Sequence, residues 1–160
     1  MNIFIMEELL KELVGKKVVY SATGGGVGSI ILLIVDNKKY GNNIWTWCYW
    51  EIYRGDELLA TADDDMTPIT GKMAVAAHAL EGETVKEVYL DSEYNLMVLF
   101  SNDLQLYLYR DAYEIDENDE DYEESWEYRI PHLDIVYLVM RNKEIRKRKY
   151  YRSEKSNDEK

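Results

Sequence analysis

The sequence predicts an α+β fold that is mostly antiparallel β-sheet, with a short N-terminal helix and a second short helix near 70–81. Runs of apolar, β-branched and aromatic residues alternate with breaks rich in Gly, Asn, Asp and Ser, which is typical of strands joined by turns. Two stretches have the spacing of three and four residues that indicates a helix. The aromatic residues are mainly tyrosine (14 Tyr, 4 Trp and 2 Phe), which suits sheet faces and binding surfaces that stay partly wet.

The N-terminal region is expected to form a helix followed by two strands. Apolar residues recur at helical spacing over 6–14, and Gly15 is placed to end this helix. The stretch "KKVVYSAT" (16–23) is predicted as a strand. The β-branched run "SIILLIVD" (29–36) is predicted as a buried strand.

The aromatic stretch "NIWTWCYWEIY" (43–53) is predicted as one further strand, with a kink allowed. Both of its faces are bulky, so we expect it inside a sheet or under a partner. Alternation places Trp45, Trp47 and Tyr49 on one face, and Ile44, Cys48, Trp50 and Ile52 near the other. A hairpin turn at 54–56 and a return strand at 57–61 follow.

The second helix is predicted over 70–81, where Thr70 can cap the start and Gly82 can end it. Its apolar residues form a single stripe at positions 73, 76, 77 and 80. A β pattern then resumes, with strands expected at 84–90, 95–100 and 104–110. Beyond an acidic loop, "WEYRIP" is a strand that Pro131 ends or places at an edge, and "LDIVYLVM" is a last strand or a short helix.

These elements predict a single globular domain over 1–140, with a basic, polar and flexible tail over 141–160. The order of turn, apolar strands, loop and Trp-Glu strand occurs twice, so residues 16–66 and 83–138 are a candidate internal repeat. Two explanations stay open: a true duplication, and two antiparallel halves whose similar needs produce similar patterns.

Four glycines within residues 24–28 invite comparison with a phosphate-binding loop. Such a loop needs a helix after it, so that backbone N–H groups face the phosphate, and a Walker loop also needs a Lys. Here Ser29 and "IILLIV" follow, which indicate a strand and contain no Lys. The glycines therefore predict a hairpin turn, because glycine adopts positive φ without steric cost.

The sequence predicts no catalytic residues, no metal site and no cofactor. Neither His78 nor His132 has a second His or a Cys three or four residues away, and Cys48 lies within the aromatic strand, which suits a small buried side chain. Three consecutive acids at 63–65 lack the alternate spacing of a calcium loop and are expected in a solvated loop.

Composition and charge limit the partners. The net charge of −12 opposes nucleic acid and permits a basic protein. A single cysteine excludes an internal disulfide and fits a reducing cytosol. No apolar run approaches the roughly 20 residues of a membrane span, and the start does not resemble a signal peptide. We therefore expect a cytoplasmic protein with no membrane partner.

The segment "DAYEIDENDEDYEES" holds nine acids and no base over 111–124. A solvated loop is one explanation. The other is a segment that attracts and binds a basic surface, because aromatic residues lie among the acids. The predicted partner-binding residues are Tyr113, Glu114, Asp116, Glu117, Asp119, Glu120, Asp121, Tyr122, Glu123, Glu124 and Trp126.

The C-terminal stretch reverses this charge, with seven bases and one acid over 141–152. It could contact nucleic acid or another anionic surface, fold back on the acidic loop, or simply keep the end of the chain soluble.

The order of these features resembles small bacterial immunity proteins of polymorphic toxin systems and related families. Over roughly residues 13–131, Trp50-Glu51-Ile52 and Trp126-Glu127-Tyr128 fill the positions of two W-x-[IL] strands. The hairpin pattern between them is filled by Leu96, Val98, Phe100, Asn102, Leu106 and Leu108. Tyr128, the acidic insertion and the basic tail depart from that pattern. The resemblance implies a non-enzymatic inhibitor that binds a toxin domain, often a nuclease, and it assigns no individual binding residue.

Three alternatives stay open beside an immunity protein. The chain could be an inhibitor encoded by a phage or mobile element and directed at a bacterial defence protein, which gene neighbourhood would distinguish. It could bind a small ligand through the glycine loop. It could also be a structural subunit of a homo-oligomer held by the aromatic faces of strand 43–53.

Overall fold

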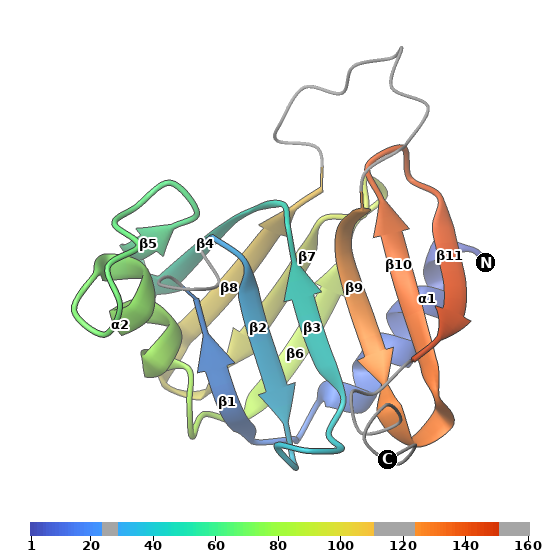
Figure 1. Cartoon of the computed structure of the whole chain (residues 1–160), viewed down its shortest axis with the longest axis horizontal. Helices are drawn as coiled ribbons and strands as arrows, with labels where there is room; N and C mark the ends of the chain where they lie inside the picture. The colour runs from blue at the N-terminus through green and yellow to red at the C-terminus, as the bar shows by residue number, and fades with distance from the viewer. Residues whose placement is uncertain (24–28, 111–123, 151–160) are drawn as a thin grey trace, which may run out of the picture.

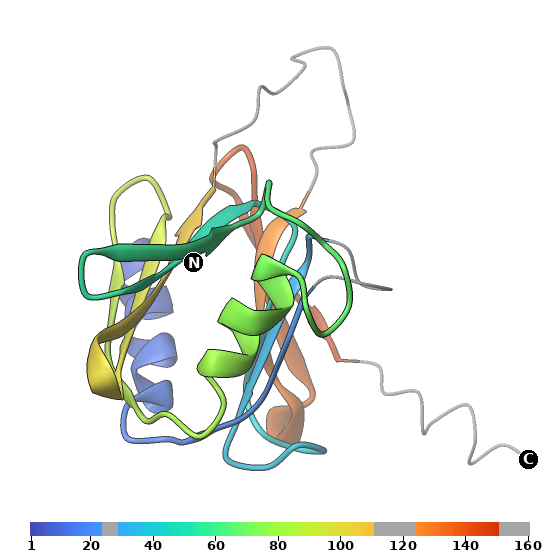
Figure 2. The same ribbon diagram turned by 90° about the vertical axis from the view of Figure 1, so that its left-hand side faces the viewer.

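The computed structural model describes residues 1–23, 29–110 and 124–150, which form two antiparallel sheets packed face to face (Figures 1 and 2). The six-stranded sheet has the order β1 (Val18–Ala22), β2 (Ile31–Val35), β3 (Asn43–Thr46), β9 (Glu124–Ile130), β10 (Ile135–Met140) and β11 (Ile145–Lys149). The five-stranded sheet has the order β5 (Glu57–Thr61), β4 (Tyr49–Arg54), β8 (Leu104–Tyr109), β7 (Leu96–Phe100) and β6 (Val85–Leu90). The predicted α+β fold is confirmed.

Two short helices lie at opposite ends of this sandwich (Figure 1). The first, α1 (Ile3–Leu10), continues into the 3₁₀ turn η1 (Lys11–Leu13) and packs against β6. The second, α2 (Lys72–Ala79), packs against β1 and β5, which are edge strands of different sheets. The helices therefore cover sheet edges that would otherwise expose unpaired backbone groups.

The core lies between the sheets and follows from strict alternation. In β2, Ile31, Leu33 and Val35 are buried, and in β8 the buried residues are Leu104, Leu106 and Leu108. Residues between them point to the outer faces, as the period of two requires. One continuous cluster joins the buried side chains of both sheets and both helices.

The chain repeats one topology twice. Each half contains a helix, a three-stranded meander in one sheet, and then a hairpin in the other sheet: α1 with β1–β5, and α2 with β6–β10. Each sheet is thus a meander of one half beside a hairpin of the other, joined where β3 pairs with β9 and β4 with β8. The two similar halves include the helices, which the predicted repeat left out.

Matching hydrogen bonds tie the halves together where α1 and α2 lead into their first strands. The Gly15 N–H donates to Val85 O, and the Gly82 N–H donates to Val18 O, each at 2.8 Å. Both glycines have φ near +87° (+86° and +87°), a conformation that other residues rarely adopt. Between them Lys17 and Thr84 form an antiparallel bridge. The symmetry of these contacts shows that the two halves share a local two-fold relation.

Two tryptophans occupy equivalent positions in the core. Trp50 and Trp126 are both completely buried, and each indole N–H donates to a carbonyl two residues before a meander's central strand. The acceptors are Ser29 O at 2.6 Å and Tyr94 O at 3.1 Å. The repeated Trp-Glu dipeptide is therefore structural: each Trp points inward, and the Glu after it points to an outer face.

The prediction of one strand over 43–53 is wrong. The chain breaks at Trp47 and Cys48, whose backbone N–H groups both donate to Ser125 O, and it then continues into the other sheet as β4. The predicted alternation still holds, since Ile44, Cys48, Trp50 and Ile52 are buried. The stretch is bulky on both faces because it serves two sheets in succession.

The helix limits differ from prediction at their starts. The first helix begins at Ile3 because the Asn2 side chain accepts from the Ile5 N–H at 3.0 Å. The second begins at Lys72, with Gly71 rather than Thr70 at the cap position. Its predicted apolar stripe is confirmed: Met73, Ala76, Ala77 and Leu80 are all buried.

The hairpin at 54–56 and the strands expected at 57–61, 84–90, 95–100 and 104–110 are confirmed to within one residue. Pro131 ends β9, but β9 lies inside its sheet between β3 and β10, not at an edge. The open choice for 133–140 is decided as strand β10.

The predicted tail is wrong over its first part, because β11 pairs with β10 along its whole length. The remaining tail residues, 151–160, lie outside the described residues, as does the predicted glycine turn at 24–28. The strands on either side of that turn, β1 and β2, pair antiparallel. Within the described ranges, no helix is long and apolar enough to cross a membrane.

Replacing Trp50 or Trp126 by Phe should destabilise the protein by similar amounts, about 1–3 kcal/mol, because each change removes an indole hydrogen bond and shrinks a completely buried side chain. Urea unfolding followed by circular dichroism would measure this. Trp47→Phe is the matched control, since Trp47 is 39 % exposed and should change stability by less than about 0.5 kcal/mol. A cost at Trp47 equal to the other two would contradict this role of the buried indoles.

Candidate functional site

Nine of the eleven predicted partner-binding residues, those from Tyr113 to Glu123, lie outside the described residues. Glu124 opens β9, is half-buried and pairs with Arg148 at 3.7 Å. Trp126 is completely buried between the sheets, so its assignment as a surface anchor is wrong. The alternation that makes β9 a strand turns this side chain inward.

The acidic segment 111–123 starts directly after a buried arginine. Arg110 is 3 % exposed, and its guanidinium donates to the backbone carbonyls of Glu93 and Arg141. Lys143 adds an ion pair with Glu93 at 2.8 Å. These contacts join the β6–β7 turn to the β10–β11 turn, so the chain enters the acidic segment from a tightly bound position at the end of β8.

The outer face of the five-stranded sheet carries a group of tyrosines, which we call the tyrosine face: Tyr49, Glu51, Tyr53, Tyr107 and Tyr109. Strands β4 and β8 are neighbours, with Tyr49 opposite Tyr109 and Glu51 opposite Tyr107. Ring centroids lie 5.7 Å apart for Tyr49 and Tyr109, and 5.5 Å for Tyr53 and Tyr107. All five side chains are half-buried, so part of each ring reaches solvent.

Glu51 is the centre of the tyrosine face. Its carboxylate accepts from the hydroxyls of Tyr49 at 2.9 Å, Tyr109 at 2.9 Å and Tyr53 at 3.2 Å. Among the described residues, no Lys, Arg or His forms an ion pair with it. The hydrogen-bond donors around this carboxylate are therefore neutral phenols and not cations.

This arrangement changes the acidity of the tyrosines. Desolvation, followed by hydrogen bonding to Glu51, raises the pKa of Tyr49 to about 12. The same two causes raise the pKa of Tyr109 further. Both phenols therefore remain protonated donors well above neutral pH, and the cluster keeps its geometry over the physiological range.

The tyrosine face continues toward β6 and β7. A hollow of about 220 Å³ lies beside Tyr107 and Tyr109 and is also lined by Met97 and Asp91. Tyr89, 47 % exposed, lies at its rim. The whole surface combines half-exposed tyrosine rings with an apolar hollow and acidic groups, and tyrosine is among the residues that are enriched at protein interfaces.

The outer face of the six-stranded sheet carries a different group, which we call the arginine face: Trp45, Glu127, Arg129, Arg148 and Tyr150. Glu127 is completely buried and pairs with Arg129, whose Nε donates to Oε1 at 2.5 Å, and with Arg148 at 3.6 Å. The Arg129 guanidinium lies over Trp45, 4.3 Å from the ring centroid. Burial raises the pKa of Glu127, and both arginines oppose that shift.

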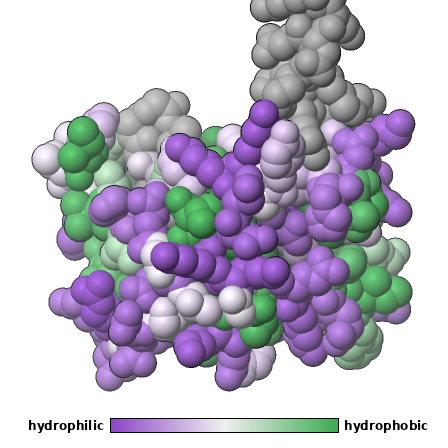
Figure 3. Space-filling view, turned by 90° about the horizontal axis from the view of Figure 1, so that it is seen from below, coloured by the Kyte–Doolittle hydropathy of each residue, from purple (hydrophilic) through white to green (hydrophobic). Residues whose placement is uncertain are grey.

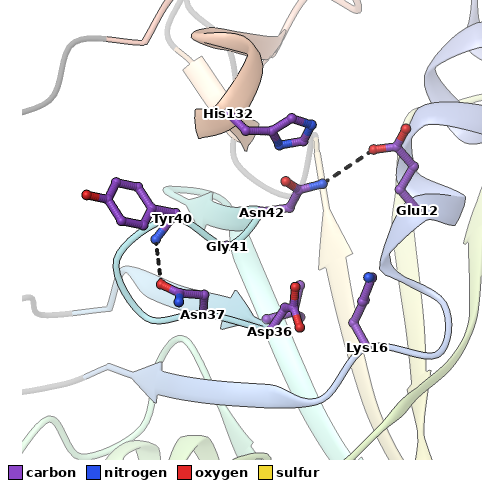
Figure 4. A pocket seen from close by; sticks show the side chains of 9 residues that line it. Glu12, Lys16, Asp36, Asn37, Tyr40, Gly41, Asn42 and His132 are labelled. Carbon is purple, nitrogen blue, oxygen red and sulfur yellow. Dashed lines mark hydrogen bonds between the residues drawn. The ribbon is translucent and has the colours of Figure 1, made fainter.

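A separate cavity of about 560 Å³ lies at the end of the sandwich near the β2–β3 turn and η4 (Pro131–Leu133) (Figure 4). Glu12, Lys16, Asp36 and His132 line it from different elements, and all four are exposed. Asn42 Nδ2 donates to Glu12 at 3.5 Å and to Tyr128 at 2.8 Å. This end of the molecule is mostly hydrophilic (Figure 3), and charges of both signs line the cavity without converging on one point.

The side chains that bear on a nucleophile or on a metal site include Cys48, His78, Asp64 and Asp65. Burial raises the pKa of the Cys48 thiol to about 12, so it is protonated at neutral pH. The exposed His78 pairs with Glu81 at 2.8 Å. Asp64 and Asp65 accept backbone N–H groups of their own loop. The described residues contain no group of three or more His, Cys, Asp or Glu side chains that could hold a metal ion.

The sequence did not single out Glu51 or the tyrosines around it as a site. Alternation already placed Tyr49 on the face opposite Trp50. However, the site also needs β8 beside β4, which is a pairing between segments about fifty residues apart. Comparison of the chain with protein-family models, curated proteins and solved structures found no match.

Replacing Glu51 by Gln should lower the pKa of Tyr49 from about 12 toward 10, because the phenolate would no longer face a carboxylate. Ultraviolet titration of tyrosinate would measure it. The wild-type folded state holds these protons more tightly than the unfolded state, so its stability should fall as pH rises from about 10 to 12. That fall should be smaller in Glu51→Gln; identical titration curves would contradict the central position of Glu51.

Replacing Arg129 by Ala should destabilise the protein by about 3–5 kcal/mol, because it leaves the buried Glu127 carboxylate without its closest cation. In a Glu127→Gln background the same change should cost far less, which a double-mutant cycle of urea unfolding would show. Arg146→Ala is the control, because its ion pair with Glu144 is exposed and its loss should change the stability little. Equal costs in both backgrounds would contradict the coupling.

Proposed function

We propose that this protein is a non-enzymatic binding protein of the immunity or antitoxin type, which acts in the cytosol and neutralises a basic toxin or nuclease domain. The observation that carries this proposal is the tyrosine face, where four half-exposed tyrosines surround a carboxylate that has no basic partner among the described residues. Tyrosine is enriched where proteins bind proteins, because one rigid side chain offers both apolar area and a hydroxyl.

Charge supports a basic partner. The chain carries a net charge of −12, and nine acids fall within 111–124. This stretch begins two residues after Tyr109, the last residue of β8 and a member of the tyrosine face. A dense negative charge linked to an aromatic surface would speed the encounter with a cationic protein, and the rings would then supply contact area. The resemblance to immunity proteins favours a toxin as that partner.

The proposal is tested by capture from the lysate of the native host with the full chain, at low and at moderate salt, followed by mass spectrometry. We expect one stoichiometric basic protein whose recovery falls with salt, and whose activity is blocked when this chain is added. The double variant Tyr53→Ala and Tyr107→Ala should lose that partner. Tyr40→Ala is the control, because Tyr40 is 45 % exposed but lies in the β2–β3 turn. Capture that is equal in both variants would overturn the proposed surface.

A further inference from the structure

We propose that Glu51 and the surrounding tyrosines form a binding site for the guanidinium group of an arginine side chain, supplied by the partner. The inference rests on the proposed function and names the chemistry that the tyrosine face recognises. It comes from comparing the two halves of the chain, which place a glutamate at the same position on the two outer faces.

Glu51 and Glu127 occupy corresponding positions in the two halves. Each follows a completely buried tryptophan, Trp50 or Trp126, in the first strand after the chain changes sheets. Each lies opposite an aromatic residue of the neighbouring meander: Glu51 opposite Tyr107 and Glu127 opposite Trp45. The two sites therefore present a carboxylate and an aromatic ring in the same relative position.

The site on the six-stranded sheet already contains its cations. Glu127 holds Arg129 and Arg148, and the Arg129 guanidinium lies over the ring of Trp45. Carboxylate, guanidinium and ring together form a favourable group, because the carboxylate pairs with the N–H edge of the guanidinium while the aromatic ring contacts its flat face. The outer face of the six-stranded sheet thus contains carboxylate, guanidinium and aromatic ring together.

The site on the five-stranded sheet has the same carboxylate and ring but lacks both cations within the described residues. Two residues after Glu127 stands Arg129, whereas two residues after Glu51 stands Tyr53. Arg148 comes from β11, and among the described residues the five-stranded sheet has no strand beyond β5. The cationic positions that the chain fills beside Glu127 are therefore left to another molecule beside Glu51.

The local geometry suits an incoming guanidinium. An ionised carboxylate offers about four lone-pair sites, and the hydroxyls of Tyr49, Tyr53 and Tyr109 occupy three of them. One acceptor site remains, and the phenol oxygens can accept further N–H groups. Because the three hydroxyls hold Glu51 in place, it needs no reordering to bind. Arginine suits this site better than lysine because its planar group can stack on the rings while it donates.

The test uses the full chain, with tyrosine rings labelled for NMR, titrated with Nα-acetyl-arginine amide. The matched probe is Nα-acetyl-citrulline amide, which has a similar shape and no charge. We expect the arginine probe to shift the ring signals of the tyrosine face with a millimolar Kd and the citrulline probe to bind about tenfold more weakly. Equal shifts with both probes would overturn the site.

Two substitutions locate the binding. Glu51→Gln should weaken the arginine probe about fivefold or more, whereas Glu87→Gln should leave it unchanged. Glu87 is the control because it also accepts from a tyrosine hydroxyl on this sheet, that of Tyr89, but is exposed on β6. Tyr107→Leu keeps Glu51 and its three donors and removes the opposite ring, so it should weaken binding about threefold or more. Unchanged affinity in Glu51→Gln or in Tyr107→Leu would overturn the proposal.

The captured partner separates the two proposals. If the Tyr53 and Tyr107 double variant loses the partner but Glu51→Gln keeps it, the tyrosine face stands and the arginine site fails. If neither change weakens capture, both proposals fail. Loss of the partner in Glu51→Gln, with Glu87→Gln still binding, is the result expected for an arginine at the centre of the interface.

Discussion

The change of sheet between the third and fourth strands of each half is the constraint on which the rest of this structure depends. At Trp47 and Cys48 the chain leaves one sheet, held by two hydrogen bonds to Ser125 O, and enters the other. In each half the chain leaves the sheet of its meander before it forms its hairpin. The sheet of each meander is therefore extended by the hairpin of the other half. The buried Trp50 and Trp126 lie just after these crossings, and their indole hydrogen bonds tie each hairpin to the meander of its own half, which lies in the opposite sheet. Each sheet contains strands of both halves, and one buried cluster spans the two sheets.

Equivalence between the halves separates what the fold needs from what it allows to vary. Each half has a glycine with positive φ and an inward tryptophan, and one bridge joins Lys17 of the first half to Thr84 of the second. Backbone pairing and core volume require these features. The glutamates that follow the tryptophans share one position but not one environment. Glu127 is buried under two arginines of its own chain, whereas Glu51 is ringed by phenols and carries no cation among the described residues. Because the same backbone position tolerates either environment, the difference between Glu51 and Glu127 is not required by the fold. We therefore look for function at Glu51.

The two outer faces therefore have different uses. The arginine face satisfies its own charges, and its buried glutamate makes it part of the stable structure. The tyrosine face leaves aromatic area and one fixed negative charge available, next to the strand end from which the acidic segment starts. Arg110 anchors that strand end to two neighbouring turns. This combination is the basis of the proposed recognition of a basic protein, in which charge would steer the encounter and aromatic contact would follow.

Local pattern alone determined most elements of this protein. Period-two alternation located the strands from β6 to β8 and the inward set of 43–53, and apolar spacing located the buried stripe of α2, because these signals depend only on neighbouring residues. The acidic segment and the net charge were likewise plain from composition. Tertiary structure decided what depends on pairing between distant segments: the break of 43–53 between two sheets, the burial of Trp126, and the strand β11, whose basic residues read locally as a solvated tail. Tertiary structure also decided the candidate site. Glu51 becomes the centre of a tyrosine cluster only because β8 places Tyr107 and Tyr109 beside β4, and local sequence periodicity does not predict that pairing.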